Sequence, residues 1–139
     1  MRIMSIDYGD ARVGVAVCDP LGITAQGVTT LANKVHEKML DALSDIIKDY
    51  KPEKIVVGLP KNMDGTSGFR AEITYKFCDE LKTICGDAEI VLFDERMTTM
   101  QADRYLHESN TRGKKRKKVV DTVAASIILQ DYLSSIKNI

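Results

Sequence analysis

Three carboxylates stand at positions from which they could act together on one ligand. Asp7 ends the first apolar run of the chain, Glu95 follows the apolar run at 90–93, and Asp121 lies in the first turns of the last predicted helix. Three oxygen donors without a convincing His or Cys partner suit a hard divalent cation, Mg²⁺ or Mn²⁺. Two such ions about 4 Å apart can activate a water and stabilise the leaving oxygen of a phosphodiester. The residue types therefore predict metal-dependent phosphodiester hydrolysis.

Each carboxylate taken alone also has a simpler interpretation. Asp7 fits the polar end of a strand, Glu95 fits a solvated loop acid with Asp94 as the true ligand, and Asp121 fits an acid that favours a helix N-terminus. The helical repeat places Asp121 in register with Ala125, which predicts an inward position. Neighbours in an extended segment point to opposite sides, so at most one of Asp94 and Glu95 faces Asp7, and Glu95 is predicted to do so. Only the convergence of all three carboxylates favours a metal site.

A second concentration of chemistry is the basic segment 112–118, which is predicted to be a loop. It holds six basic residues and no acid, while the rest of the chain carries 14 basic and 20 acidic residues. A charge run is usually a solvated face, but this one ends three residues before Asp121, which favours a grip on a phosphate backbone. The absence of interleaved aromatic residues argues for backbone contact rather than base stacking. The predicted contacts are Arg112, Lys114, Lys115, Arg116, Lys117 and Lys118.

Four further residues are assigned to nucleic-acid binding. Lys61 and Asn62 lie in the loop after the run at 55–59, where they could contact phosphate or sugar, although a plain connecting loop is the alternative. Arg96 either binds the scissile phosphate with its planar fork or pairs with a neighbouring acid. Arg12, after the first turn, is assigned the same binding role. His36 and His107 are expected on helix surfaces, outside the mechanism.

The elements that position these residues follow from hydrophobic periodicity. Strands are predicted at 2–7, 12–18 and 23–31, and the continuous apolar runs at 55–59 and 90–93 indicate strands buried on both faces. Short turns predict that the first three strands are antiparallel, and right-handed crossovers make the first, fourth and fifth strands parallel. Helices are predicted at 35–50, along the stripe of Phe69, Ile73, Phe77, Leu81 and Ile84, at about 99–108, and from Val119 to Ile136. The expected fold is α/β, a mixed five-stranded sheet with helices on both faces.

Length and composition bound the whole molecule. The chain has 139 residues and 44% hydrophobic residues, which predicts one domain over 1–139 and excludes disorder. No apolar run is long enough to cross a membrane, and the N-terminus does not resemble a signal peptide. The three cysteines form no CxxC pair, which predicts small buried residues and a cytoplasmic location.

Six motifs occur in order along the chain: SIDYG at 5–9, RVGVA at 12–16, VGLP at 57–60, NMDG at 62–65, DERMTT at 94–99 and DTVAA at 121–125. In these motifs, the chain resembles the bacterial Holliday junction resolvase family that is also described as the pre-16S ribosomal RNA nuclease family. The resemblance covers residues 2 to about 134. It implies a ribonuclease-H-like fold, a metal-dependent nuclease site at Asp7, Glu95 and Asp121, and action on branched DNA or precursor ribosomal RNA.

The resulting expectation is a nuclease that uses Mg²⁺ or Mn²⁺ and a water nucleophile. Precursor 16S rRNA, processed at its 5′ end in ribosome biogenesis, ranks ahead of a four-way DNA junction, and ribosomal particles are possible partners. The alternative is a nucleic-acid-binding ribosome assembly factor that does not cleave. A third interpretation compares the Gly-rich turn after Asp7 with the phosphate loop of actin-like and sugar-kinase ATPases, but those enzymes close two such domains around ATP. The oligomeric state is left open.

Overall fold

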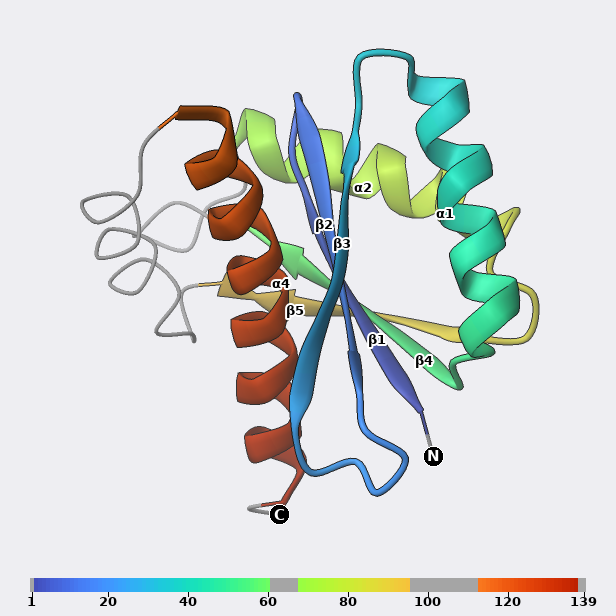
Figure 1. The fold of residues 1–139 in the computed structure, drawn as a ribbon. Helices are drawn as coiled ribbons and strands as arrows, with labels where there is room; N and C mark the ends of the chain where they lie inside the picture. Colours follow the sequence, from blue (N-terminus) through green and yellow to red (C-terminus); the bar gives the residue numbers. More distant parts are fainter. Residues whose placement is uncertain (1, 61–67, 96–112, 138–139) are drawn as a thin grey trace.

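A five-stranded sheet lies between helices in the computed structural model, which describes residues 2–60, 68–95 and 113–137, with only the backbone at 113–122 and at 137 (Figure 1). The strand order is β3-β2-β1-β4-β5. β1, β2 and β3 are antiparallel, whereas β1, β4 and β5 are parallel, as predicted. The elements are β1 (Ile3–Tyr8), β2 (Arg12–Cys18), β3 (Ala25–Ala32), α1 (His36–Tyr50), β4 (Lys54–Leu59), α2 (Phe69–Lys82), β5 (Glu89–Asp94) and α4 (Gly113–Lys137).

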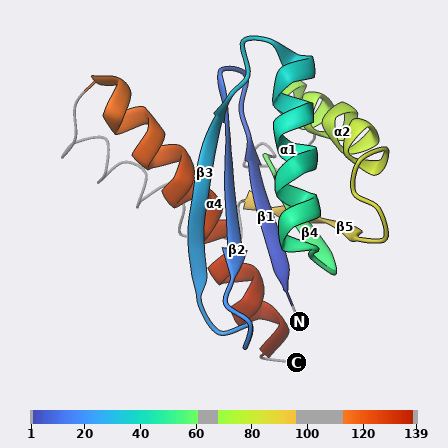
Figure 2. The same cartoon turned by 45° about the vertical axis from the view of Figure 1, so that its right-hand side comes forward.

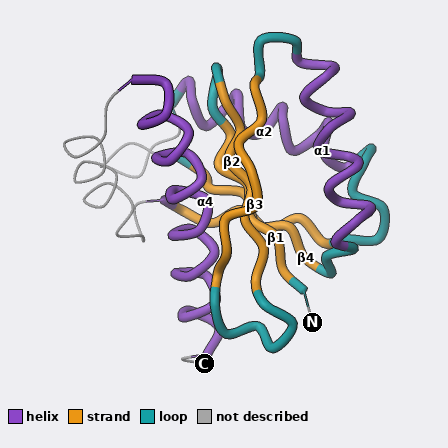
Figure 3. Tube along the Cα trace, in the orientation of Figure 1, coloured by secondary structure: helices purple, strands orange, loops and turns teal. Residues whose placement is uncertain are grey.

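Helices cover both faces of this sheet, which confirms the predicted layers. Figures 2 and 3 show α4 on one side of the strands and α1 with α2 on the other. The residues of β2 explain why α4 can approach the sheet closely. Its three valines belong to the core under α1 and α2, and its small residues Ala16 and Cys18 belong to the core under α4. The small face lets α4 lie near the sheet, because little side chain separates the two backbones.

The two helices on the first face differ in how well their sequence predicts them. α1 buries Met39, Leu43 and Ile47 at helical spacing, as expected, and ends where Lys51 adopts the left-handed conformation with φ 49°. The predicted stripe of α2 is wrong at its start, since Phe69 is 75% exposed. α2 begins at Phe69 and turns a different face inward. Its buried residues are Ala71, Thr74, Phe77, Cys78 and Leu81.

β5 is not buried on both faces, contrary to its apolar sequence. It is the last strand of the sheet, so only β4 flanks it, and Leu92 is 39% exposed. A run of apolar residues looks the same for a central strand and for an edge strand. The prediction that β5 is buried on both faces is therefore wrong, because its residues are only half-buried or exposed, while the parallel pairing with β4 is correct.

α4 begins at Gly113, so the basic residues from Lys114 to Lys118 lie in its first turns and not in a loop. Lys and Arg are good helix formers, which explains the longer helix. Positive charges are unfavourable near a helix N-terminus, so helix propensity outweighs this effect at the start of α4. The predicted helix at 99–108, with His107, lies outside the described residues.

All three cysteines are buried and free of disulfide bonds, as predicted. Cys78 lies in α2, whereas Cys85 lies beyond its end. Burial raises the pKa of the Cys78 thiol to about 11, which keeps it protonated at neutral pH. No described helix is long and apolar enough to cross a membrane.

Candidate active site

Asp7 lies on the face of the sheet that α4 covers. Along β1, Met4 and Ile6 belong to the core under α1 and α2, whereas Ile3 belongs to the core under α4 and Ser5 bonds to α4. Side chains alternate along a strand, so Asp7 continues the α4 side. It is half-buried near the carboxyl end of β1. This edge of a parallel sheet is where ligands bind in open α/β folds.

Glu95 lies over Gly58 of β4, on the same face. A Cβ atom added to Gly58 would come within 2.6 Å of Oε1 of Glu95 and 2.7 Å of Cδ1 of Ile128 in α4. The parallel register pairs Ile6 of β1 with Val57 of β4, and the next positions along the two strands are Asp7 and Gly58. Glycine at 58 therefore leaves the space in which the Glu95 carboxylate sits, one strand away from Asp7.

Asp94 belongs to the other side of β5. Val91 and Phe93 contact the core under α4, and Ile90 contacts the opposite core. The alternation places position 94 with Ile90 and position 95 with Phe93. The contact between Glu95 and the Cβ direction of Gly58 agrees with this alternation. The structure thus brings Glu95, rather than Asp94, to the face that carries Asp7.

A buried hydrogen bond sets the level of α4 on β1. The Ser5 hydroxyl, which is fully buried, donates to the Ala125 carbonyl oxygen over 2.6 Å. Asp121 precedes Ala125 by one helical turn, about 5.4 Å, and Asp7 follows Ser5 by two strand residues, about 6.6 Å. α4 runs in the opposite direction to β1 (Figure 1), so the backbone at 121 comes level with Asp7. The side chain of Asp121 lies outside the described residues.

The described acids on this face are of the ligand type that a divalent cation prefers. Where side chains are described, no three His, Cys, Asp or Glu residues form a metal cluster. Two of the three predicted ligands, Asp7 and Glu95, belong to that part of the chain, and both present carboxylate oxygens on one face. Oxygen ligands of this kind suit Mg²⁺ or Mn²⁺ better than softer metals. The missing Cβ of Gly58 leaves the space that the Glu95 carboxylate and Ile128 occupy.

The turn between β1 and β2 closes the edge next to Asp7. The Gly9 amide donates to the Arg12 carbonyl oxygen over 2.9 Å, and a Cβ on Gly9 would lie 2.7 Å from that oxygen. Glycine is therefore required for so close an approach. Arg12 starts β2 just beyond this turn and is half-buried. The structure places Arg12 at the predicted edge of the sheet.

The side chains of the remaining predicted contacts to nucleic acid lie outside the part of the chain that the structure describes. Lys61, Asn62, Arg96 and Arg112 belong to segments that the structure does not describe. Lys114, Lys115, Arg116, Lys117 and Lys118 have a described backbone in α4 but no described side chains. Their predicted roles remain predictions.

Two features of the site were missed by reasoning from sequence alone. Ser5 is a lone hydroxyl inside an apolar run, and such a residue usually needs a buried partner, which is the signal that could have identified it. Gly58 interrupts the apolar run of β4, and a glycine inside a buried strand often marks the close approach of another group. Neither signal identifies the group that approaches, because Ala125 and Glu95 belong to other parts of the chain.

Comparison with known proteins places this arrangement in a family. The chain matches the family model described as "RuvX: Holliday junction resolvase" over residues 1–135. A protein of Halothermothrix orenii named "Putative pre-16S rRNA nuclease" is 50% identical over 134 residues, which cover 96% of this chain and 95% of that protein. A protein of Clostridium acetobutylicum with the same name is 48% identical over 136 residues, covering 98% of this chain and 100% of the relative.

Solved structures show the same fold at low sequence identity. RuvC of T. thermophilus, in complex with a Holliday junction substrate, has a TM-score of 0.60 at 9% identity and covers 99% of this chain and 96% of its own. Fowlpox virus resolvase, in complex with Holliday junction DNA, has a TM-score of 0.59 at 12% identity. The match covers 98% of this chain and 99% of the viral chain. The fold is thus ribonuclease-H-like, and the chain belongs to the RuvX family of Holliday junction resolvases, a family of nucleases.

Proposed function

We propose that the chain is a nuclease that hydrolyses phosphodiester bonds in structured nucleic acid with Mg²⁺ or Mn²⁺ held by Asp7, Glu95 and Asp121. The observation that carries this proposal is the Glu95 carboxylate over Gly58, in register beside Asp7, on the face covered by α4. Asp7 in β1 and Glu95 directly after β5 are far apart in sequence, and the strand alternation and the contact with Gly58 put both on this face. The donor set, all carboxylate, agrees with the cation chemistry that the sequence predicts.

The residues of the chain hold and orient the reacting groups. A divalent cation held by these carboxylates would supply a water nucleophile at neutral pH and would stabilise the leaving oxygen. Asp7 and Glu95 provide the negative charge for it from the ends of two parallel strands, which are rigid supports. Ile128 of α4, which is fully buried, lies against the Cβ direction of Gly58. Ser5 fixes the height of α4, and with it the backbone at Asp121.

The basic residues of α4 are proposed to hold the phosphate backbone. Lys114 to Lys118 occupy the first turns of α4, immediately before Asp121. A charged helix end beside the carboxylates would offset their repulsion of a polyanion. Arg12 approaches from the β1–β2 turn. Lys61, Asn62, Arg96 and Arg112 complete the proposed contacts.

The proposed substrate is precursor 16S rRNA, ahead of a four-way DNA junction. Relatives that are 48–50% identical over nearly their whole length carry the ribosomal RNA name. The structures in complex with junction DNA are only 9–12% identical and support the fold alone. Cytoplasmic action on precursor ribosomal particles is the setting that follows from this choice.

The test is cleavage of labelled precursor 16S rRNA and a four-way junction side by side, with Mn²⁺ and with a chelator. We expect metal-dependent cleavage, faster on the RNA, which is abolished in Asp7→Asn and in Glu95→Gln. Asp41→Asn, the same charge change on the exposed face of α1, is the matched control and should cut like the wild type. Equal binding of RNA in chelator without any cleavage would favour the non-cleaving assembly factor instead.

A further inference from the structure

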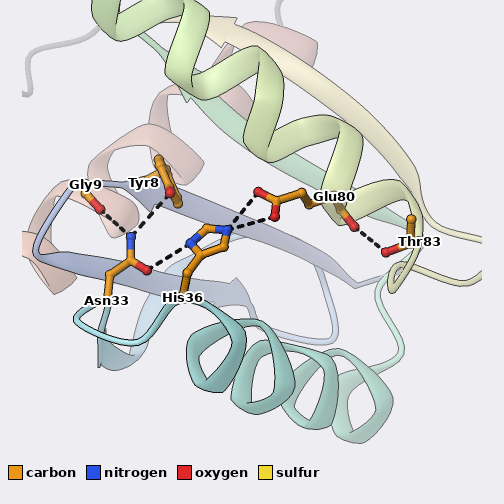
Figure 4. A network of polar contacts seen from close by, with 6 residues as sticks. All are labelled: Tyr8, Gly9, Asn33, His36, Glu80 and Thr83. Atoms are coloured by element: carbon orange, nitrogen blue, oxygen red, sulfur yellow. Dashed lines mark hydrogen bonds and ion pairs between the residues drawn. The ribbon is translucent and has the colours of Figure 1, made fainter.

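A chain of polar contacts links α2 to the turn that follows Asp7 (Figure 4). Both carboxylate oxygens of Glu80 lie 2.8 Å from Nε2 of His36, the first residue of α1. Nδ1 of His36 lies 3.2 Å from Oδ1 of Asn33. The Asn33 amide nitrogen donates to the Gly9 carbonyl oxygen over 3.0 Å and to the Tyr8 hydroxyl over 3.3 Å. The contacts thus reach the two residues that directly follow Asp7.

The Gly9 carbonyl fixes the direction of every bond in this chain. A carbonyl oxygen only accepts, so the nitrogen of the Asn33 amide must face Gly9 and its oxygen must face His36. Nδ1 of His36 then has to donate to that oxygen. Nε2 faces the Glu80 carboxylate, which accepts when ionised. All contacts are satisfied together only when both ring nitrogens of His36 carry a proton.

The same residues anchor the turn into the core. The Tyr8 ring stacks on Phe77 of α2 with centroids 4.2 Å apart, and His36 meets the Tyr8 ring edge-on at 6.4 Å. The Asn33 backbone amide donates to the Ala11 carbonyl oxygen over 2.9 Å. Asn33 therefore holds the β1–β2 turn through its backbone and its side chain. What fixes Tyr8 and Gly9 also fixes the backbone that leaves Asp7.

We propose that His36 is a positioning residue of the nuclease site: it orients Asn33, whose amide clamps the Gly9 carbonyl and holds the strand end at Asp7. The inference rests on the proposed function, since it concerns how that site is held. His36 touches no reacting group and acts only through Asn33. This proposed role differs from the expectation that His36 lies outside the mechanism: its side chain is 38% exposed, yet both of its ring nitrogens have polar partners.

The first measurement is hydrogen exchange of the Gly9 amide, which is independent of cleavage. A neutral hydrogen bond contributes about 1 kcal/mol, so we expect about fivefold faster exchange in Asn33→Ala and in His36→Gln, and a smaller rise in Glu80→Gln. Asp79→Asn is the matched control. It removes the same charge from the neighbouring exposed residue of α2, whose described ion pair is with Lys82, and it should leave exchange unchanged. Unchanged exchange in Asn33→Ala would overturn the clamp.

The second measurement is kcat and KM for Mn²⁺-dependent cleavage of labelled precursor 16S rRNA. We expect His36→Gln to lower kcat about fivefold and to leave KM unchanged, because His36 touches no substrate and acts only on the turn beside Asp7. Asp79→Asn should match the wild type in both constants. A wild-type kcat in His36→Gln, or a change in KM alone, would contradict the proposal.

The two failures are distinguishable. Faster Gly9 exchange in the variants together with wild-type cleavage rates would show a clamp that does not position the site, and the inference would be wrong while the proposed function stands. A wild type that binds RNA but never cuts would refute the proposed function and the positioning role with it, whatever the exchange data show for the turn.

Discussion

Gly58 is the residue on which the geometry of the candidate site depends most. It sits on a buried strand, and the carboxylate of Glu95 occupies the place of its missing side chain. We predict that Gly58→Ala displaces Glu95 and lowers the cleavage rate at least about tenfold. Overpacking of this kind also lowers the free energy of unfolding by about 1–3 kcal/mol. Cleavage assays and denaturant unfolding measure the two effects.

Gly27→Ala provides the control for Gly58→Ala, because Gly27 is exposed on the edge strand β3 and far from the carboxylates in the sheet order. It should cut at the wild-type rate. A Gly58→Ala protein that folds and cuts like the wild type would show that Glu95 does not need this space, and that its position over β4 has no part in catalysis.

At the scale of elements, the bond from Ser5 to Ala125 connects the strand that bears Asp7 to the helix that bears Asp121. We predict that Ser5→Ala lowers the free energy of unfolding by about 1 kcal/mol and reduces cleavage, because α4 loses its fixed level on β1. Ser135→Ala is the matched control: it removes a hydroxyl-to-carbonyl bond of the same 2.6 Å length, but within α4. Equal cleavage by the two variants would contradict this role of Ser5.

The basic residues in the first turns of α4 give a second prediction at the scale of elements. Replacing Lys114, Lys115, Arg116 and Lys117 by Ala should weaken nucleic-acid binding across sequences and flatten the salt dependence by about two to four units. Alanine favours helix, so α4 and the thermal stability should be retained. Binding measured over a series of salt concentrations tests this. An unchanged affinity with an unchanged salt slope would show that these charges only face solvent.

Some properties of the helices and strands could be predicted from the sequence, and others could not. Alternation in β2 and the connection lengths predict the strand directions, because both are local properties of the chain. The burial of β5 and the face of α2 near Phe69 are not local, since they depend on which neighbours the sheet order supplies. The start of α4 is set by a competition between helix propensity and the helix dipole, which the sequence alone does not resolve.

The features of the candidate site also divide into those that the sequence predicts and those that it does not. The sequence predicts Asp7 and Glu95 because they end apolar runs whose strands are parallel. It does not predict that Glu95 lies over Gly58, that Ser5 holds α4, or that His36 is tied to Glu80, because each contact joins elements distant in the chain. Those contacts require the packed structure.

In the molecule as a whole, the proposed functional residues lie at one edge and on one face of the sheet. The parallel strands β1, β4 and β5 deliver their carboxyl ends there, α4 covers the face, and the β1–β2 turn closes the edge beside Asp7 (Figure 1). The largely acidic body outside the basic segment would repel a polyanion elsewhere. Substrate is therefore expected to approach along the start of α4.

The most direct test of the central claim is a crystal structure with Mn²⁺, in which anomalous scattering locates the ions. The account predicts Mn²⁺ on the α4 face of the sheet, beside Gly58 and in contact with the carboxylates of Asp7 and Glu95, and no such density in Asp7→Asn crystals. Mn²⁺ bound by Asp94 with Glu95 in solvent, or ions found only away from Asp7 in active protein, would contradict it.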